Sequence, residues 1–377
     1  MCETVTETLK PTPSWILTQL NMPTNIPQEI LEIIIGYATS DGHYFSTCAA
    51  SVISLTSHTF HQIVLPYKFK SLTFRRRKGY LGTKDPKFCE AIDAGDAHAL
   101  SLGPLVRELN LLNFMRSGRD CLENYVLQIP VERILKSVTS FQNLTRLSMQ
   151  KCVTSPAIIK QLGKLRQLQS LHTYRCGDAG YGYEASYGAL SDLQSLHTLG
   201  CEGDSYSLER HLAYVSMKNL RVLMSSDMAV TQAFLTTEPP VQLKELYLLT
   251  HIYHVINFPF ELLWNYLARV TSLTHLSLAD LRPLAPDGIP STIFHLPKLQ
   301  YLHIHVAFAP RFADQPMKEM RIISKREPEA MVEVVRRHWQ GIVFPHVEYL
   351  KTDRPDELDF IPIEFWREFL LNVKEVG

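Results

Sequence analysis

The chain has 377 residues, and its 38 basic side chains are balanced by 38 acidic ones. This balance argues against a general nucleic-acid-binding protein, which needs a basic electrostatic field. A hydrophobic fraction of 45% is typical of globular proteins, and the length predicts about two or three domains.

The N-terminal segment MCETVTETLK is polar and acidic, and it lacks the basic and apolar stretches of a secretory signal. No apolar run in the sequence reaches the roughly 18 residues of a membrane span. The seven cysteines are scattered without a CxxC pair, which favours free thiols in a reducing compartment. We therefore expect an intracellular protein of the cytoplasm or nucleus, with neither membrane nor nucleic acid among its partners and a disordered tail at 1–21.

The segment TNIPQEILEIIIGYATS (24–40) predicts a helix with more apolar surface than one partner needs. Thr24 is a typical N-cap, and Pro27 suits the first turn, where a missing N–H costs nothing. The apolar side chains from Ile30 to Ala38 cover about 200° of the helical wheel, whereas a surface helix usually shows a stripe of about 100° or a little more. Such a helix lies inside a large core or contacts two partners.

Three short motifs follow one another in and after this helix. They are IPQEIL at 26–31, SLTSHTF at 54–60, and LPYKFKSL at 65–72. Residues 49–74 predict a second apolar helix, a return helix and a short strand. In this order the motifs resemble an F-box, particularly the form common in fungal proteins. The sequence departs from that pattern in its leading isoleucine and in the longer polar link at 41–48.

The F-box resemblance implies a helical domain at 22–74 that binds a Skp-family adaptor of a cullin–RING ubiquitin ligase. The residues that would contact the adaptor by this resemblance are Ile26, Pro27, Ile30, Leu31, Ile34, Leu55 and Phe60. The alternative is that these side chains form a private core with the residues that follow, so that the helices only cap the rest of the protein. The basic run RRRK (75–78) is typical of a solvated linker, which we expect at 75–104.

The second half of the sequence contains an internal repeat whose starts are 23 to 30 residues apart. The units are LTRLSMQKC (144–152), LQSLHTYRC (168–176), LQSLHTLGC (193–201), LRVLMSSDM (220–228), LKELYLLTH (243–251), LTHLSLADL (273–281) and LQYLHIHVA (299–307). Weaker units begin at Val106 and Val347. The 48 residues between Leu299 and Val347 contain a coil that is either enlarged or unrecognised.

These units resemble the leucine-rich repeat, and three of them end in cysteine, as in its longer variants. The resemblance implies an α/β solenoid over 105–377, with a curved parallel sheet and helices on its convex side. Alternate residues of each unit point the same way, as a strand requires, and neighbouring coils stack into a continuous core. We expect Cys152, Cys176 and Cys201 to be buried in the turns that follow the strands.

Helices are predicted between the strands, where apolar residues recur at helical spacing. The predicted segments are 130–141, 155–168, 259–273 and 327–339, together with an amphipathic helix at 361–376 that would close the last coil.

Five histidines fall on predicted strands at positions that should face the concave surface: His172, His197, His275, His303 and His305. We place Tyr174, Arg175, Tyr247 and Tyr301 on the same face. Aromatic and arginine side chains are typical of binding hot spots, so we interpret this face as the surface for a protein target. A solvated sheet face is the alternative, and the spacing of the histidines does not predict a metal site.

The two copies of LQSLHT make this prediction specific. In the first copy, Leu168 and Leu171 should point into the core while His172 points outward. Because the second copy is identical, the same contrast is expected there between Leu196 and His197.

No segment of the sequence predicts catalysis or a cofactor. The glycine-rich segment CGDAGYGYEASYG (176–188) lacks the lysine and the hydroxyl residue of a phosphate-binding loop. The sequence therefore predicts a non-enzymatic substrate receptor, whose F-box-like helices recruit a ubiquitin ligase while the repeats hold a protein target nearby. The alternatives are a ligase-independent repeat scaffold and, less favoured, an enzyme with an unrecognised site.

Overall fold

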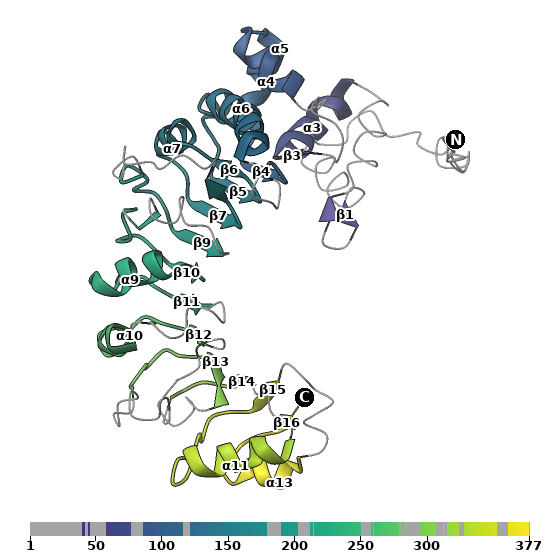
Figure 1. Cartoon of the computed structure of the whole chain (residues 1–377). Coiled ribbons are helices and arrows are strands. Elements are labelled where there is room, and N and C mark those ends of the chain that lie inside the picture. The colour runs from purple at the N-terminus through teal and green to yellow at the C-terminus, as the bar shows by residue number, and fades with distance from the viewer. Residues whose placement is uncertain are drawn as a thin grey trace, which may run out of the picture. The chain divides into compact units, whose positions relative to one another are not determined.

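The computed structural model describes residues 40–41, 44–45, 58–76, 86–115, 121–178, 190–202, 212–213, 215–249, 258, 260–278, 281, 294–306, 312, 315–323, 328–352 and 361–376. The chain divides into two compact units, Met1–Phe69 and Lys70–Gly377 (Figure 1). In the first unit the structure describes helix α3 (His58–Phe69) and an antiparallel hairpin of strands β1 (Ser40–Asp41) and β2 (Tyr44–Phe45).

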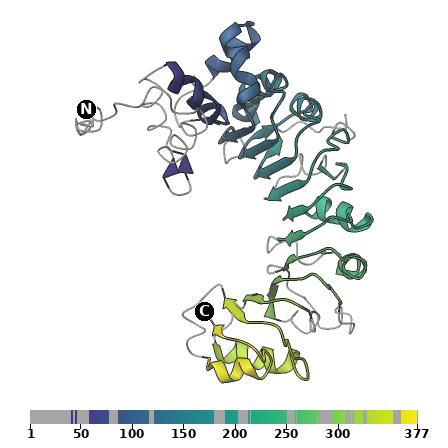
Figure 2. The same cartoon turned by 180° about the vertical axis from the view of Figure 1, so that it is seen from behind.

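The second unit is built on one open sheet of 12 strands, all of them parallel to their neighbours. Strands that follow one another in the sequence lie side by side in the sheet, with β3 at one end and β16 at the other (Figures 1 and 2). The strands are β3 (Ser71–Arg75), β4 (Glu108–Leu112), β5 (Arg146–Gln150), β7 (Ser170–Tyr174), β9 (Thr198–Glu202), β10 (Val222–Ser225), β11 (Glu245–Leu248), β12 (His275–Leu278), β13 (Tyr301–His305), β14 (Glu319–Ile323), β15 (Tyr349–Thr352) and β16 (Glu375–Val376).

A row of buried apolar side chains crosses the sheet at one position of every coil. Its members on consecutive strands are Leu109, Leu147, Leu171, Leu199, Leu223, Leu246, Leu276, Leu302, Met320 and Leu350. In most coils two further apolar residues precede this one at intervals of three, as in Leu165, Leu168 and Leu171. The repeat frame is therefore an apolar triplet, and the strand forms around its third member.

Helices of the second unit lie on one side of the sheet (Figure 1). Those between strands are α6 (Cys121–Val138), α7 (Pro156–Gly163), α9 (Met228–Thr236), α10 (Phe260–Leu267), α11 (Pro328–His338) and α13 (Ile363–Arg367). Side-chain caps fix two of their starts: Ser155 accepts a hydrogen bond from the Ile158 N–H in α7, and Asp227 accepts one from the Val230 N–H in α9. None of the helices in the described part of the chain is long and apolar enough to cross a bilayer.

Side-chain amides connect successive coils at the turn before the strand. Asn143 donates to the Pro104 carbonyl at 2.7 Å, and Asn219 donates to the Gln194 carbonyl at 2.8 Å. Three other amides donate in the same backward direction: Gln167 to Phe141, Gln242 to Asn219, and Asn372 to Pro345. We call this set the turn amides. Each satisfies a carbonyl that the turn would otherwise leave to water.

Several segments differ from the sequence-based expectation. Strand β3 (Ser71–Arg75) pairs with β4 as the first strand of the large sheet, whereas residues 71–74 were assigned above to the N-terminal domain and Arg75 to the linker. Residues expected to form a linker at 75–104 include helices α4 (Pro86–Asp93) and α5 (Ala97–Leu102), followed by the short turn η1 (Gly103–Leu105). The apolar side of this segment, with Cys89, Ile92 and Ala99, is buried in the core, which a solvated linker would not provide.

The prediction of a C-terminal helix over 361–376 is wrong in its length. Only α13 is helical there, and the chain then turns at Leu370 and ends in β16, which pairs with β15. Leu370 and Val373 belong to the apolar triplet of another coil, and the period of three resembles helical spacing closely enough to mislead.

The long interval after Leu299 holds an unrecognised coil. Strand β14 pairs with β13 and β15, and its triplet contains Met317 and Met320 where the other coils have leucine. Methionine fills the same core volume with a flexible side chain, so the coil closes although the leucine pattern is lost.

Candidate target-binding face

The side of the large sheet opposite the helices carries the candidate site, and we call it the strand face. Side-chain burial alternates along strands such as β4 and β13. The first, third and fifth residues of these strands are partly exposed, and the second and fourth are buried. Two outward rows run side by side across this face. The first contains Glu108, Arg146, Ser170, Thr198, Val222, Glu245, His275, Tyr301, Glu319 and Tyr349, and the second contains Asn110, Ser148, His172, Gly200, Met224, Tyr247, Ser277, His303, Arg321 and Lys351.

Most residues predicted for a target-binding face belong to this surface. His172, Tyr247 and His303 lie in the second row, and His275 and Tyr301 lie in the first. Tyr174 and His305 occupy the last positions of β7 and β13. Arg175 follows β7 in the turn, where its backbone has a positive φ of 49°.

The prediction that His197 lies on a strand and faces outward is wrong. His197 lies one residue before β9, and its N–H and that of Thr198 both bond to the Gln169 carbonyl. The residue of β9 opposite His172 is Gly200. The unit therefore begins at Leu196 and not at Leu193, because the strand forms around Leu199, the third apolar residue of the triplet.

The same shift changes the position of one cysteine. Cys152 and Cys176 follow strands β5 and β7, as expected, and both are buried. Cys201 is also buried, but it lies inside β9 opposite Thr173 and Ser225. Burial raises the pKa of the Cys152 thiol well above its ordinary value, which disfavours a reactive thiolate.

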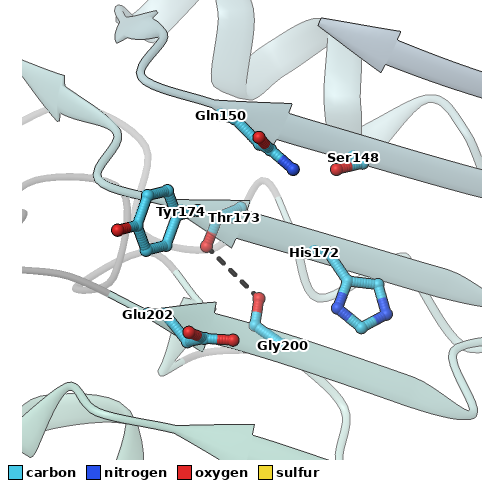
Figure 3. A pocket seen from close by; sticks show the side chains of 7 residues that line it. All are labelled: Ser148, Gln150, His172, Thr173, Tyr174, Gly200 and Glu202. Carbon is cyan, nitrogen blue, oxygen red and sulfur yellow. Dashed lines mark hydrogen bonds between the residues drawn. The ribbon is translucent and has the colours of Figure 1, made fainter. Parts of the chain in front are cut away.

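A hollow of about 370 Å³ opens on the strand face over β5, β7 and β9 (Figure 3). We call it the Gly200 hollow, and it is lined by Ser148, Gln150, His172, Thr173, Tyr174, Gly200 and Glu202. Gly200 allows the His172 ring to lie against the strand: a Cβ at this position would lie 2.3 Å from Nδ1 of His172 and 3.0 Å from its Cε1. The imidazole thus occupies the space above a glycine backbone.

The charge in the hollow comes from one carboxylate. Partial burial lowers the pKa of His172, and the nearby Glu202 carboxylate offsets part of this lowering. His172 is therefore neutral at pH 7 and offers one donor and one acceptor nitrogen. The Arg175 guanidinium lies over the Tyr174 ring, 5.2 Å from its centroid.

A second group of side chains lies farther along the face, on β11, β12 and β13. We call it the ring cluster, and it consists of Tyr247, His275, Tyr301 and His303. The ring centroids of His275 and Tyr301 are 5.7 Å apart, and those of Tyr301 and His303 are 6.4 Å apart. Ser277 Oγ and His303 Nδ1 are 3.2 Å apart, so a hydrogen bond joins neighbouring strands. The ring cluster is therefore a packed surface, unlike the Gly200 hollow.

Polar partners hold the ring cluster in place. The Tyr247 hydroxyl donates to Glu245 Oε2 at 3.0 Å, and burial together with this acceptor raises the pKa of Tyr247 to about 12. Burial also raises the pKa of Tyr301. Lys351 pairs with Glu319 at 2.9 Å on the adjoining strands, and this contact raises the pKa of the lysine.

The predicted residues of this face form two separate groups. His172 and Tyr174 share the Gly200 hollow, whereas the ring cluster begins on β11. Strands β9 and β10 separate β7 from β11, which corresponds to about 14 Å at the usual strand spacing. Sequence reasoning missed Gln150, Gly200 and Glu202 in the hollow, and Arg321 beside the ring cluster. The triplet frame would have placed each of them on the strand face.

The residues assigned to adaptor binding remain a prediction. Ile26, Pro27, Ile30, Leu31, Ile34 and Leu55 lie outside the described residues, and Phe60 belongs to helix α3. Within the described ranges, no group of three or more histidine, cysteine or acidic side chains is arranged to hold a metal ion.

No protein-family model matches this sequence, and comparison with curated proteins finds no relative.

Proposed function

We propose that this protein is a substrate receptor of a Skp–cullin–F-box type ubiquitin ligase. Its F-box-like helices at 22–74 would bind the adaptor, and a leucine-rich-repeat solenoid would bind a protein target on the strand face. The receptor performs no chemistry: it raises the effective concentration of target lysines near the ligase. This role fits an intracellular protein of fungal F-box type.

The observation that carries the target-binding half is the strand face itself. Open sheets of stacked coils present long surfaces that suit protein partners. Aromatic side chains line this one in the ring cluster, and Tyr174, Arg175 and Tyr349 lie on it as well. Tyrosine and arginine supply much of the binding energy in protein interfaces.

The adaptor half of the proposal rests on the F-box resemblance and the wide apolar arc of the helix at 24–40. The division of the chain after Phe69 supports it, because the residues of the three motifs up to that point fall in their own compact unit. The helix predicted at 24–40 would need a second partner for one of its two apolar faces in such a small unit.

Co-expression with a Skp-family adaptor tests this proposal. We expect the adaptor to co-purify with the full chain, and Ile30→Asp with Ile34→Asp to abolish this, because charges in a desolvated apolar interface are costly. Val241→Asp is the matched control, since it adds a charge at an apolar residue that is 94% exposed in the second unit. Adaptor binding that survives the double substitution would show that the interface is misassigned.

A ligase-independent scaffold is the second candidate, and one observation favours it. Strand β3 directly follows α3 in the chain and is the terminal strand of the sheet, which is where a repeat array requires a cap. If the variant with Ile30→Asp and Ile34→Asp no longer unfolds in one cooperative transition, the helices serve as that cap.

A further inference from the structure

We infer that the Gly200 hollow is a subsite for a basic side chain of the target, best filled by the guanidinium of an arginine. This inference rests on the proposed function, because it names the chemistry that the target must present to the strand face. Its basis is a hollow lined by several neutral hydrogen-bond acceptors and by one carboxylate that has no counter-ion among the described residues.

The position of the His172 ring in the hollow depends on Gly200. Gly200 has no side chain, and the neighbouring outward position on β7 carries His172, whose ring lies over the glycine. Any larger residue would meet Nδ1 of this ring at 2.3 Å and displace it into the hollow. The neighbouring coils carry a side chain at this position, whereas on β9 the His172 ring covers the bare backbone.

The Glu202 carboxylate has no counter-ion among the residues that the structure describes. It is half-buried at the end of β9, and neither an ion pair nor a side-chain hydrogen bond joins it to a neighbour in the described ranges. Two other glutamates of the strand face have basic partners: Glu108 pairs with Arg146 at 2.6 Å, and Glu319 with Lys351 at 2.9 Å. A half-buried carboxylate without a partner favours a cationic ligand.

Arg175 is a cation beside the hollow, and its guanidinium packs on Tyr174 and does not pair with Glu202. The guanidinium lies 5.2 Å from the centre of the Tyr174 ring. Tyr174 therefore brings an aromatic ring, with a guanidinium over it, to the lining of the hollow.

The remaining polar groups favour guanidinium over ammonium. Gln150 and Ser148 on β5, and His172 and Tyr174 on β7, each offer an acceptor, and Glu202 on β9 offers two oxygens (Figure 3). They are spread over three strands, or about 10 Å at the usual spacing. A planar guanidinium directs five N–H donors outward and reaches such a ring of acceptors, whereas an ammonium is a compact charge with three donors.

Titration of the full chain with an acetylated, amidated Gly-Arg-Gly tripeptide tests the inference. Binding is followed by the amide NMR signals of the protein, and the matching citrulline tripeptide is the neutral isostere. We expect the arginine peptide to shift the signals of Gly200 and Glu202, and the citrulline peptide to leave them in place. Glu202→Gln should weaken arginine binding by at least about fivefold, because a half-buried charged hydrogen bond contributes more than an exposed ion pair.

Two further variants locate the binding. Gly200→Ala should weaken it comparably by displacing His172, whereas Glu375→Gln, a glutamate of β16 on the same face, should leave it unchanged. Equal binding of arginine and citrulline peptides, an unaffected Glu202→Gln variant, or no binding of the arginine peptide would each overturn the inference. The adaptor assay reports separately: if the adaptor binds and the peptide does not, only this inference fails.

Discussion

The hexapeptide LQSLHT occurs twice, at 168–173 and at 193–198, and the two copies fold differently. In the first copy, Ser170 to Thr173 belong to strand β7, with Leu171 in the core and His172 on the strand face. In the second copy, only Thr198 reaches strand β9, and the preceding residues form the turn that leads into it. The second copy therefore corresponds in structure to residues 165–170 and not to 168–173.

The difference shows that neighbouring leucines set the phase of each strand. The first copy is preceded by Leu165 and the second is followed by Leu199, so the third member of the triplet falls at different places in the hexapeptide. Stacking on the previous coil rewards the phase that buries all three leucines. Six identical residues do not override that gain, since local propensity is weaker than burial.

The largest test of this difference uses the threonine that ends each copy. Thr173 is 2% exposed and points into the core, whereas Thr198 lies in the first outward row. Thr173→Asp should lower the free energy of unfolding by about 3–5 kcal/mol, because it buries a carboxylate without a partner. Thr198→Asp should change it by less than about 1 kcal/mol, since exposed substitutions have small effects.

Chemical denaturation of the two variants measures both values. Equal losses of stability at Thr173 and Thr198 would mean that the copies share one phase after all.

A smaller effect tests the contact that His172 makes with the second copy's strand. Gly200→Ala should cost about 1 kcal/mol in the full chain, because the new Cβ displaces the His172 ring. In a His172→Ala background the same change should be neutral or stabilising by about 0.5 kcal/mol, since glycine in a strand carries an entropic penalty relative to alanine. The double-mutant cycle should therefore show coupling, and strictly additive changes would contradict the placement of His172 over Gly200.

The smallest expected effect is the titration of His172. Its pKa in the folded chain should lie below the ordinary value of about 6.5, since burial disfavours the imidazolium. The unfolded chain then binds the proton more readily, so the stability that depends on neutral His172 is present above about pH 6.5 and declines as the pH falls through that value. Glu202→Gln should lower the pKa further, because the carboxylate favours the charged ring.

Imidazole NMR signals followed across pH, with His172→Gln to assign the resonance, give this pKa directly. An unchanged pKa in the Glu202→Gln variant would separate the two residues electrostatically.

The core of the large sheet was predictable from the sequence where leucine marks it. Between Leu147 and Leu302 a buried leucine recurs every 23 to 30 residues, and a period of this kind leaves few other ways to bury these leucines. Helix starts such as Pro156 were predictable as well, because the cap and the proline precede an apolar face. The coil around β14 was not, because Met317 and Met320 carry no leucine signal.

The candidate site was predictable only in part. The histidines and tyrosines of the ring cluster follow directly from the strand phase of their own coils. The Gly200 hollow was hidden, because it depends on which residue of β9 lies opposite His172. That pairing is a relation between two coils, and neither coil's own sequence states it.

The turn amides all donate toward the preceding coil, so the array has a direction. Removing a coil from the C-terminal end deletes its donor and leaves an acceptor carbonyl of the new last coil to water: without Asn372, the Pro345 carbonyl loses its donor. Removing a coil from the N-terminal end deletes the acceptor of the new first coil: without Pro104, the amide of Asn143 has only water to bond. Truncation therefore exposes a different group at each end, a backbone carbonyl at the C-terminal end and a side-chain amide at the N-terminal end.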